Sequence, residues 1–299
     1  NNGVATSTGV SSGILGSSRL GAKGSTNLAD GVTGIFALEI GFESDTGFLK
    51  TYSGNPATAT ASSSGGTSGT GFNRRSFAGV ETNFGTLTLG RDYTPIYYAN
   101  LESDIFKFGL YGNTQTTVPL AGGSEKFARV SNAIFYTSPK LGGLTGRLAY
   151  SFGSESAGTV GTTPKDGNTF FGIGAVYKNG FLTLSGSYQE LNTPDVAGAT
   201  PTFTGSISKR PDTSIGARWD TGSYAVAVGT WRMGAPVNAS DSWVGASVKI
   251  GQGNLITQVQ RIRQDNTGGS ERSGTVFGLG YVYNVNKAFD VYATYGQVQ

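Results

Sequence analysis

Apolar and polar residues alternate along most of this chain with a period of two. In the segment 36–43, Phe36, Leu38 and Ile40 fall on one face and Glu39 falls on the other. The segment 275–283 repeats the pattern, with aromatic and aliphatic residues at every second position and glycines between them. Because side chains alternate between the two faces of a β-strand, this pattern predicts strands with one apolar and one polar face.

The same alternation recurs in about fourteen segments, which predicts an all-β chain. The expected strands are 17–25, 32–43, 71–82, 85–92, 128–138, 143–153, 168–178, 180–190, 212–220, 223–232, 241–250, 254–263, 274–284 and 288–297.

Short and long connections between these segments alternate strictly. Most of the short ones join glycine to Asn or Asp, the residues that tight hairpin turns favour. The short connections centre on 30–31, 83–85, 140–143, 178–180, 220–222, 251–253 and 284–287. The long ones are 44–70, 93–127, 154–167, 191–211, 233–240 and 264–273. Outer-membrane barrels sort their connections in this way, with short periplasmic turns and long outward loops.

The two faces of the expected sheet differ in a way that indicates where water lies. The polar face is rich in Gly, Ser and Thr. The apolar face often has the small residues Ala or Val in the middle of a strand and has aromatic residues towards the strand ends. This resembles a lipid-facing band with aromatic girdles around a polar lumen. No run of about eighteen apolar residues is present for a helical span. The sequence therefore predicts a transmembrane antiparallel β-barrel.

Composition narrows the possible chemistry. The chain has 299 residues, of which 48 are glycine, and it contains neither Cys nor His. Thiol nucleophiles, disulfides and the most common general base and metal ligand are therefore absent, so we expect no enzyme, cofactor or metal site. The net charge of +3 gives no sign of a nucleic-acid partner.

Six segments in order along the first half resemble the general trimeric porins of Gram-negative bacteria, most nearly the anion-selective porins of β-proteobacteria. They are 18–24 (SRLGAKG), 27–31 (NLADG), 37–39 (ALE), 71–77 (GFNRRSF), 83–92 (NFGTLTLGRD) and 131–139 (SNAIFYTSP). The second half matches in pattern only.

The resemblance implies a single porin domain over residues 1–299 with a sixteen-stranded barrel, so that the first and last strands are missing from the fourteen seen here. It also implies a homotrimer in the outer membrane, passive diffusion of small hydrophilic solutes with a mild preference for inorganic or organic anions, and a third loop, 93–127, folded into the lumen.

In such porins, arginines on the barrel wall face acidic groups of the third loop. Carried over by motif, the expected constriction residues are Arg19, Arg74, Arg129, Glu39 and Asp104. Further possible lining residues are Lys23, Arg91, Glu102, Arg147 and Arg218. Arg91 shares the parity of the apolar Leu87 and Leu89, so it reaches the lumen only if a bulge intervenes.

Other interpretations stay open at this point. Two Asp-Thr-Gly motifs, at Asp45 and Asp220, resemble the paired aspartates of pepsin-like proteases, in which one carboxyl acts as acid and the other as base. Asp-Thr-Gly is also ordinary turn chemistry. A soluble secreted all-β protein, such as an adhesin, and a substrate-specific or enzymatic barrel are the remaining alternatives.

Overall fold

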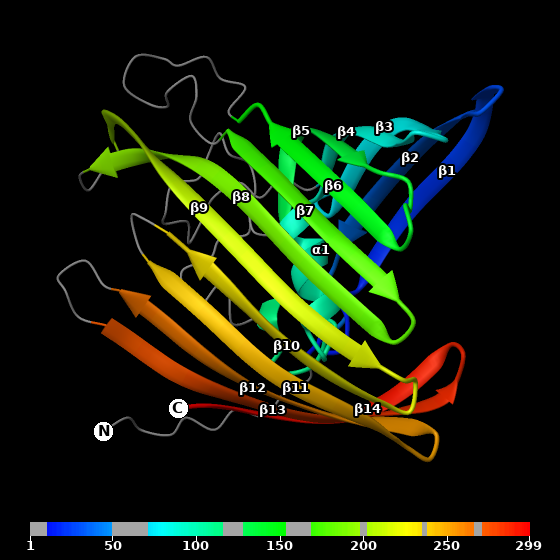
Figure 1. Ribbon diagram of the computed structural model, residues 1–299, viewed down its shortest axis with the longest axis vertical. Helices are drawn as coiled ribbons and strands as arrows, with labels where there is room; N and C mark the ends of the chain where they lie inside the picture. Colours follow the sequence, from blue (N-terminus) through cyan, green and yellow to red (C-terminus); the bar gives the residue numbers. More distant parts are fainter. Residues whose placement is uncertain are drawn as a thin grey trace.

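The computed structural model describes residues 11–49, 71–115, 128–153, 169–197, 202–234, 238–265 and 271–299. These residues form one antiparallel sheet in which each of fourteen strands pairs with its neighbours in chain order (Figure 1). The strands are β1 (Arg19–Ala29), β2 (Val32–Gly41), β3 (Arg75–Thr82), β4 (Gly85–Tyr93), β5 (Arg129–Thr137), β6 (Leu144–Ser151), β7 (Phe170–Asn179), β8 (Leu182–Ala197), β9 (Thr202–Asp220), β10 (Tyr224–Met233), β11 (Ala239–Ile250), β12 (Gly253–Asp265), β13 (Glu271–Asn286) and β14 (Phe289–Val298). All fourteen expected strands are confirmed, in the expected order.

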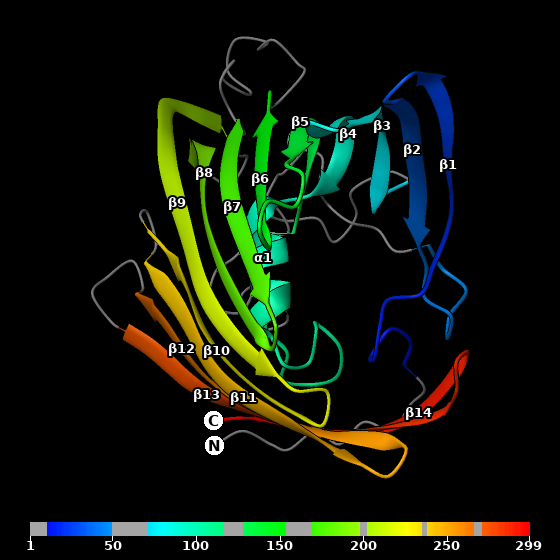
Figure 2. The same ribbon diagram turned by 45° about the vertical axis from the view of Figure 1, so that its right-hand side comes forward.

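The sheet curls around a hollow that holds the helix α1 (Pro95–Ser103) (Figure 2). The strands β1 and β14 are the two ends of the sheet and are not paired with each other in the part of the chain described. Since every connection from an odd to an even strand is short, the short turns all lie at one end of the sheet. Gly31 and Gly222, in two of these turns, have φ values of 73° and 84°, a conformation that favours glycine.

Several boundaries differ from the sequence prediction: β3, expected from residue 71, begins at Arg75, and strands extend into two of the expected links. We expected a long link over 191–211, but β8 and β9 continue as a paired hairpin as far as Ala197 and Thr202. A smaller extension brings β13 forward to Glu271, where it pairs with Asp265. The amino acids of both extensions are mostly polar, so they lack the apolar periodicity on which the prediction relied.

The helix α1 was not predicted, although its start carries a recognisable signal. Thr94 caps the helix by accepting a hydrogen bond from the Tyr97 backbone N–H at 3.3 Å. Pro95 then occupies the first turn, where its missing N–H costs nothing.

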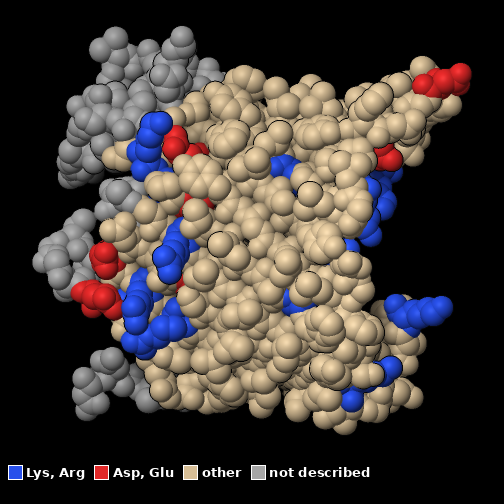
Figure 3. Space-filling model, viewed as in Figure 1, with Lys and Arg blue, Asp and Glu red and all other residues tan. Residues whose placement is uncertain are grey.

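The outer face of the sheet is apolar and exposed. Ile215, Val228 and Val244, on three successive strands, are 68%, 54% and 59% exposed. Tyr150 is also exposed and lies between Ile134 and Phe171 on the neighbouring strands. Charged side chains are sparse over the middle of this face and gather towards the strand ends (Figure 3). The apolar residues therefore point away from the hollow, as the alternation predicted.

Among the described residues, no helix is long and apolar enough to cross a membrane.

Candidate functional site

The helix α1 and the segment that follows it cover one half of the inner wall. The helix packs on β7, β8 and β9. Ser185 on β8 donates a hydrogen bond to the carbonyl of Ala99 at 2.8 Å, and Trp243 on β11 donates its indole N–H to the carbonyl of Ser103 at 3.0 Å. Further along, Gln258 on β12 accepts from the backbone N–H of Ile105 at 3.2 Å. These three contacts between uncharged groups help to hold the loop to the wall of β7–β14.

Glycines make this close approach possible. A side chain at Gly216 would overlap Ser103, and a Cβ at Gly174 would lie 3.0 Å from Pro95. On β13, a Cβ at Gly278 would lie 2.6 Å from the carbonyl oxygen of Tyr111. Part of the high glycine content is therefore explained by the space that the loop needs.

The opposite half of the wall carries a group of arginines around Tyr93, at the end of β4. The Tyr93 hydroxyl accepts hydrogen bonds from the guanidinium groups of Arg74 and Arg129, each at 2.8 Å. The Arg129 guanidinium also lies 4.3 Å from the centre of the Tyr93 ring, and Tyr97 of α1 stacks on that ring at 4.1 Å. Tyr93 therefore joins two wall arginines to the loop.

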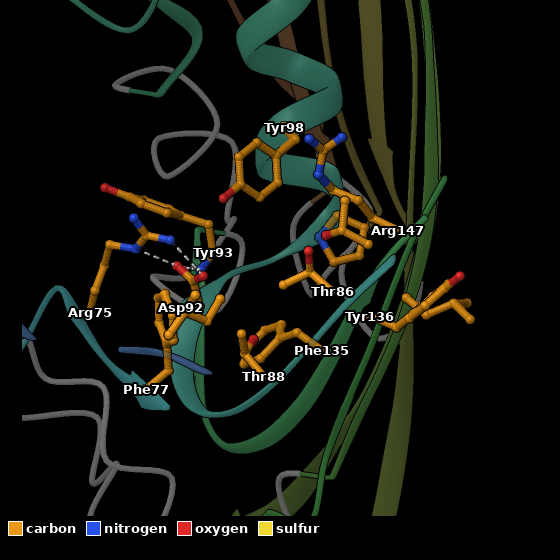
Figure 4. A pocket seen from close by; sticks show the side chains of 14 residues that line it. Arg75, Phe77, Thr86, Thr88, Asp92, Tyr93, Tyr98, Phe135, Tyr136 and Arg147 are labelled. Carbon is orange, nitrogen blue, oxygen red and sulfur yellow. Dashed lines mark hydrogen bonds and ion pairs between the residues drawn. The ribbon is translucent and has the colours of Figure 1, made fainter. Parts of the chain in front are cut away.

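Two carboxylates lie in the same group. Arg74 pairs with Glu39 at 2.5 Å, and Arg75 pairs with both oxygens of Asp92 at 2.8 and 2.9 Å. A further arginine, Arg147 on β6, lies 4.2 Å from the ring of Tyr98 (Figure 4). We call these residues the arginine–tyrosine cluster: Glu39, Arg74, Arg75, Asp92, Tyr93, Tyr97, Tyr98, Arg129 and Arg147.

Formal charges in the cluster do not cancel, since four arginines face two carboxylates. The tyrosines do not change this balance. Burial raises the pKa of Tyr98 to about 12, and burial also raises the pKa of Tyr97, so both phenols are neutral at physiological pH. The cluster is therefore a positively charged wall that faces a neutral, aromatic side of the loop.

Asp104, expected as an acidic partner of the wall arginines, is instead engaged within the loop. It is fully buried and accepts hydrogen bonds from the backbone N–H groups of Phe106, Phe108 and Thr114 and from the Thr114 hydroxyl. Burial raises the pKa of this carboxyl. The side chain organises the loop after α1, a role that its place in the motif did not reveal.

Glu102 lies at the end of α1 nearer the short turns and is paired with two lysines. Lys178 lies 2.8 Å and Lys107 3.4 Å from its carboxylate. Burial acts to raise the pKa of Glu102, but these two lysines outweigh it and the pKa is lowered. Arg218, also on the inner face, pairs with Asp220 at 2.7 Å. These residues form a second charged group, between the cluster and the short turns.

Three other expected residues lie outside the cluster. Arg19 and Lys23 are exposed on β1 and share the inner face with Glu39 through the β1–β2 register. Arg91 lies at a register shift between β4 and β5, and its guanidinium donates to the carbonyl of Asn73 and the hydroxyl of Ser131. The extra residue of this register shift lies on β5, and β3 pairs with β4 without a shift, so Arg91 keeps the outward parity of Leu87 and Leu89. The bulge that would turn Arg91 to the lumen is therefore not on its own strand.

Sequence reasoning missed Arg75, Asp92 and the three tyrosines of the cluster. Arg75 follows Arg74 directly, and Asp92 follows Arg91, so both lay within the quoted motifs. Tyr93, Tyr97 and Tyr98 flank the start of α1. Recognising the Thr94-Pro95 helix start would have placed these rings together on the loop.

The structure rules out a paired-aspartate site. Asp45 follows β2 at the long-loop end of the sheet, whereas Asp220 closes β9 at the short-turn end, so the two carboxyls cannot share a proton. Within the described ranges, no group of three or more Asp or Glu side chains is placed to hold a metal ion.

Several known proteins are similar to this chain in sequence. The family model of the Gram-negative porins matches residues 1–299. An outer membrane porin of Bordetella pertussis is 26% identical, covering 95% of this chain and 77% of that protein. Outer membrane porin protein 32 of Delftia acidovorans is 25% identical, covering 95% of this chain and 75% of its own length.

Solved structures agree with this assignment at the level of the fold. An anion-selective porin from Comamonas acidovorans superposes with a TM-score of 0.73 at 23% identity, over 94% of this chain and 78% of that one. A loop-deleted OmpT of Vibrio cholerae gives 0.66 at 16% identity, over 94% and 84%. With an apolar outer face, a polar hollow and a full-length family match, this chain belongs to the Gram-negative porins and is an outer-membrane channel, not an enzyme, through which small hydrophilic solutes and ions diffuse passively.

Proposed function

We propose that the arginine–tyrosine cluster is the constriction of this pore and gives it a mild preference for anions. The observation that carries the proposal is the excess of arginine over carboxylate on the inner wall at β2–β6, opposite Tyr97 and Tyr98 of α1. Arginine stays charged at every physiological pH, and rings of basic side chains are the expected lining of anion pores.

The neutral face of the loop sharpens this proposal. If carboxylates of the loop faced the arginines, an electric field would run across the pore. Their negative charge would also offset part of the positive potential that the arginines create. Here the loop presents Tyr97 and Tyr98 to the wall, while Asp104 is engaged in the loop and Glu102 is paired with lysines. The field at the constriction then comes mainly from the wall, and a low-dielectric passage concentrates it.

Such a field raises the local concentration of anions without holding them. The arginines are engaged with Tyr93, Glu39 and Asp92, and Arg74 and Arg129 are buried, so a passing anion is attracted by their field without displacing these partners. Weak binding at several points is what allows a solute to enter and also to leave. We therefore expect a preference that salt reduces, since the screening length shrinks from about 10 Å at 0.1 M to about 3 Å at 1 M.

The anion preference has support from a neighbour in structure, the Comamonas acidovorans porin, whose name describes it as anion-selective. From the family resemblance we also propose that the chain forms a closed barrel of sixteen strands and that three such barrels form a homotrimer. Closure of the barrel would give the edges of β1 and β14 partners, which they need because hydrocarbon does not tolerate unpaired backbone groups.

Planar-bilayer recording in a KCl gradient tests this proposal. We expect stepwise conductance increments and a reversal potential that corresponds to a chloride permeability greater than that of potassium. A reversal potential of the cationic sign would contradict the assigned role of the cluster, and the absence of increments would contradict pore formation itself.

A further inference from the structure

A cavity opens beside the constriction, between β3–β6 and α1 (Figure 4). Its volume is 210 Å³, and it is lined on one side by the Arg75–Asp92 pair and on the other by Arg147 and Tyr98. Phe77 and Phe135 also line it. The register places these strand residues on the inner face of the sheet, so the charged and aromatic side chains named here belong to the pore wall.

The charge in this cavity is not balanced. Asp92 neutralises Arg75 through a two-oxygen ion pair. Arg147 has no carboxylate partner within the described residues, and its guanidinium lies 4.2 Å from the ring of Tyr98. A guanidinium that lies on a ring still has N–H groups at its edge, and these form the fork that suits a carboxylate. The cavity therefore offers a site for one negative charge.

The remaining lining suits a flat apolar body. The cavity is lined by five aromatic residues, Phe77, Tyr93, Tyr98, Phe135 and Tyr136. Threonine side chains, Asp92 and the two arginines also line it. An apolar cavity of about 150 Å³ is large enough to hold benzene. A volume of 210 Å³ can therefore take a single six-membered ring with a carboxylate attached.

We propose that this cavity is a binding subsite of the pore for small aromatic carboxylates of the benzoate type. The carboxylate pairs with Arg147, and the ring lies among Phe77, Phe135 and the tyrosines. The inference rests on the proposed function, because the cavity receives its ligand from the constriction. A solute that occupies the subsite slows the flow of chloride past the cluster, so occupancy is visible as a partial block.

The test measures chloride conductance through the purified protein in a planar bilayer while sodium benzoate is added. Sodium acetate controls for the charge without the ring, and benzamide controls for the ring without the charge. We expect benzoate to block at a concentration several-fold lower than acetate, with no block by benzamide. Equal block by benzoate and acetate in a pore that still prefers chloride overturns the subsite and leaves the proposed function standing.

Variants locate the site. Arg147→Gln should raise the half-blocking benzoate concentration several-fold while acetate block changes little. Arg232→Gln removes an arginine from the outward face of β10 and should leave the benzoate block unchanged. If Arg147→Gln does not fold, Phe77→Leu, which removes a lining ring and keeps all charges, should weaken the block by benzoate alone. An unchanged benzoate block in the folded variants would overturn the assignment.

Discussion

The two halves of the inner wall are built differently. On the half formed by β7–β14, glycines and mostly uncharged side chains lie against α1 and the segment after it, and one ion pair joins Lys178 to Glu102. On the half that includes β3–β6, arginines and tyrosines border a cavity. The first half allows the loop to approach the wall closely. The second half carries the arginines and borders the cavity.

The comparison separates two properties of the inner wall, the space that it leaves for α1 and the charge that it carries. Glycines leave space for α1 on one wall, so the described part of the loop lies close to that wall, and a cavity is present beside Arg75 and Arg147. The position of α1 and the charge of the opposite wall are therefore separate properties, which can be changed separately.

The largest effect should come from filling the space under α1. Gly216→Val places a branched side chain where Ser103 already lies, so the helix must move into the passage. Overpacking of this kind costs about 1–3 kcal/mol, and we expect a lower yield of folded protein and a marked fall in single-channel conductance.

Gly186→Val is the matched control for this change. Gly186 lies on the adjacent strand and faces outward, and a Cβ added there would lie 3.8 Å from its nearest neighbour, the carbonyl oxygen of Ser214. If both variants conduct like the wild type, glycine at 216 is not what sets the position of α1.

Reversing one charge of the open wall should have the next largest effect. Arg129→Glu replaces a buried guanidinium next to Tyr93 by a carboxylate. Charges a few ångströms apart interact by roughly 1–4 kcal/mol at effective dielectric constants between those of the protein surface and water. We expect the anion-to-cation permeability ratio to fall by about three- to tenfold, read as a shift of the reversal potential.

Arg74→Glu should shift the reversal potential in the same direction, and it should also destabilise the fold because it leaves Glu39 beside a second carboxylate. Arg232→Glu introduces the same change on the outward face, away from the passage, and should leave the reversal potential as it is. Equal shifts from Arg129→Glu and Arg232→Glu would mean that overall charge, and not the cluster, governs selectivity.

A smaller change removes only the hydroxyl that joins two arginines. Tyr93→Phe leaves Arg74 and Arg129 without a shared acceptor, which costs about 1–3 kcal/mol for buried donors. We expect lower thermal stability, noisier open-channel current and a permeability ratio changed by less than about threefold. Tyr150→Phe, on the outer face, is the control. Identical traces from Tyr93→Phe and the wild type would show that the hydroxyl does not hold the arginines in place.

The smallest expected effect concerns pH. The pKa of Glu102 is lowered in the folded protein, so its ion pairs stabilise the fold above the unfolded value of about 4.3 and this stabilisation is lost as the pH falls through the folded pKa. Partly exposed pairs are worth about 0.2–1 kcal/mol. Glu102→Gln should therefore lower the melting temperature slightly at neutral pH and not in strong acid. A difference that persists in strong acid would show that the ion pairs are not its source.

Much of the fold could be predicted from the sequence, since the period of two and the glycine-containing turns are local properties. In residues 36–43 and 275–283 the alternation of apolar and polar residues is visible in the sequence, and the pair Asp30-Gly31 indicates a turn. The β8–β9 extension was missed because its few apolar residues do not form a sustained alternating pattern.

The site was predicted less completely, because it depends on contacts between distant segments. The motifs pointed to Arg74, Arg129 and Glu39, which lie together on the inner wall, but the partners of Asp104 are set by the loop conformation after α1. The central place of Tyr93 also depends on a helix that packs against glycines far along the chain, such as Gly216.

Cysteine accessibility tests the central claim, that water and ions pass along the β3–β6 half of the wall and not between α1 and β8. This chain contains no cysteine, so Thr137→Cys, beside the cavity, and Ser185→Cys, under α1, each introduce a single thiol on the inner face. An anionic, water-soluble thiol reagent should modify Thr137→Cys rapidly and lower its conductance in steps, while Ser185→Cys resists. Equal or faster modification of Ser185→Cys would contradict the account.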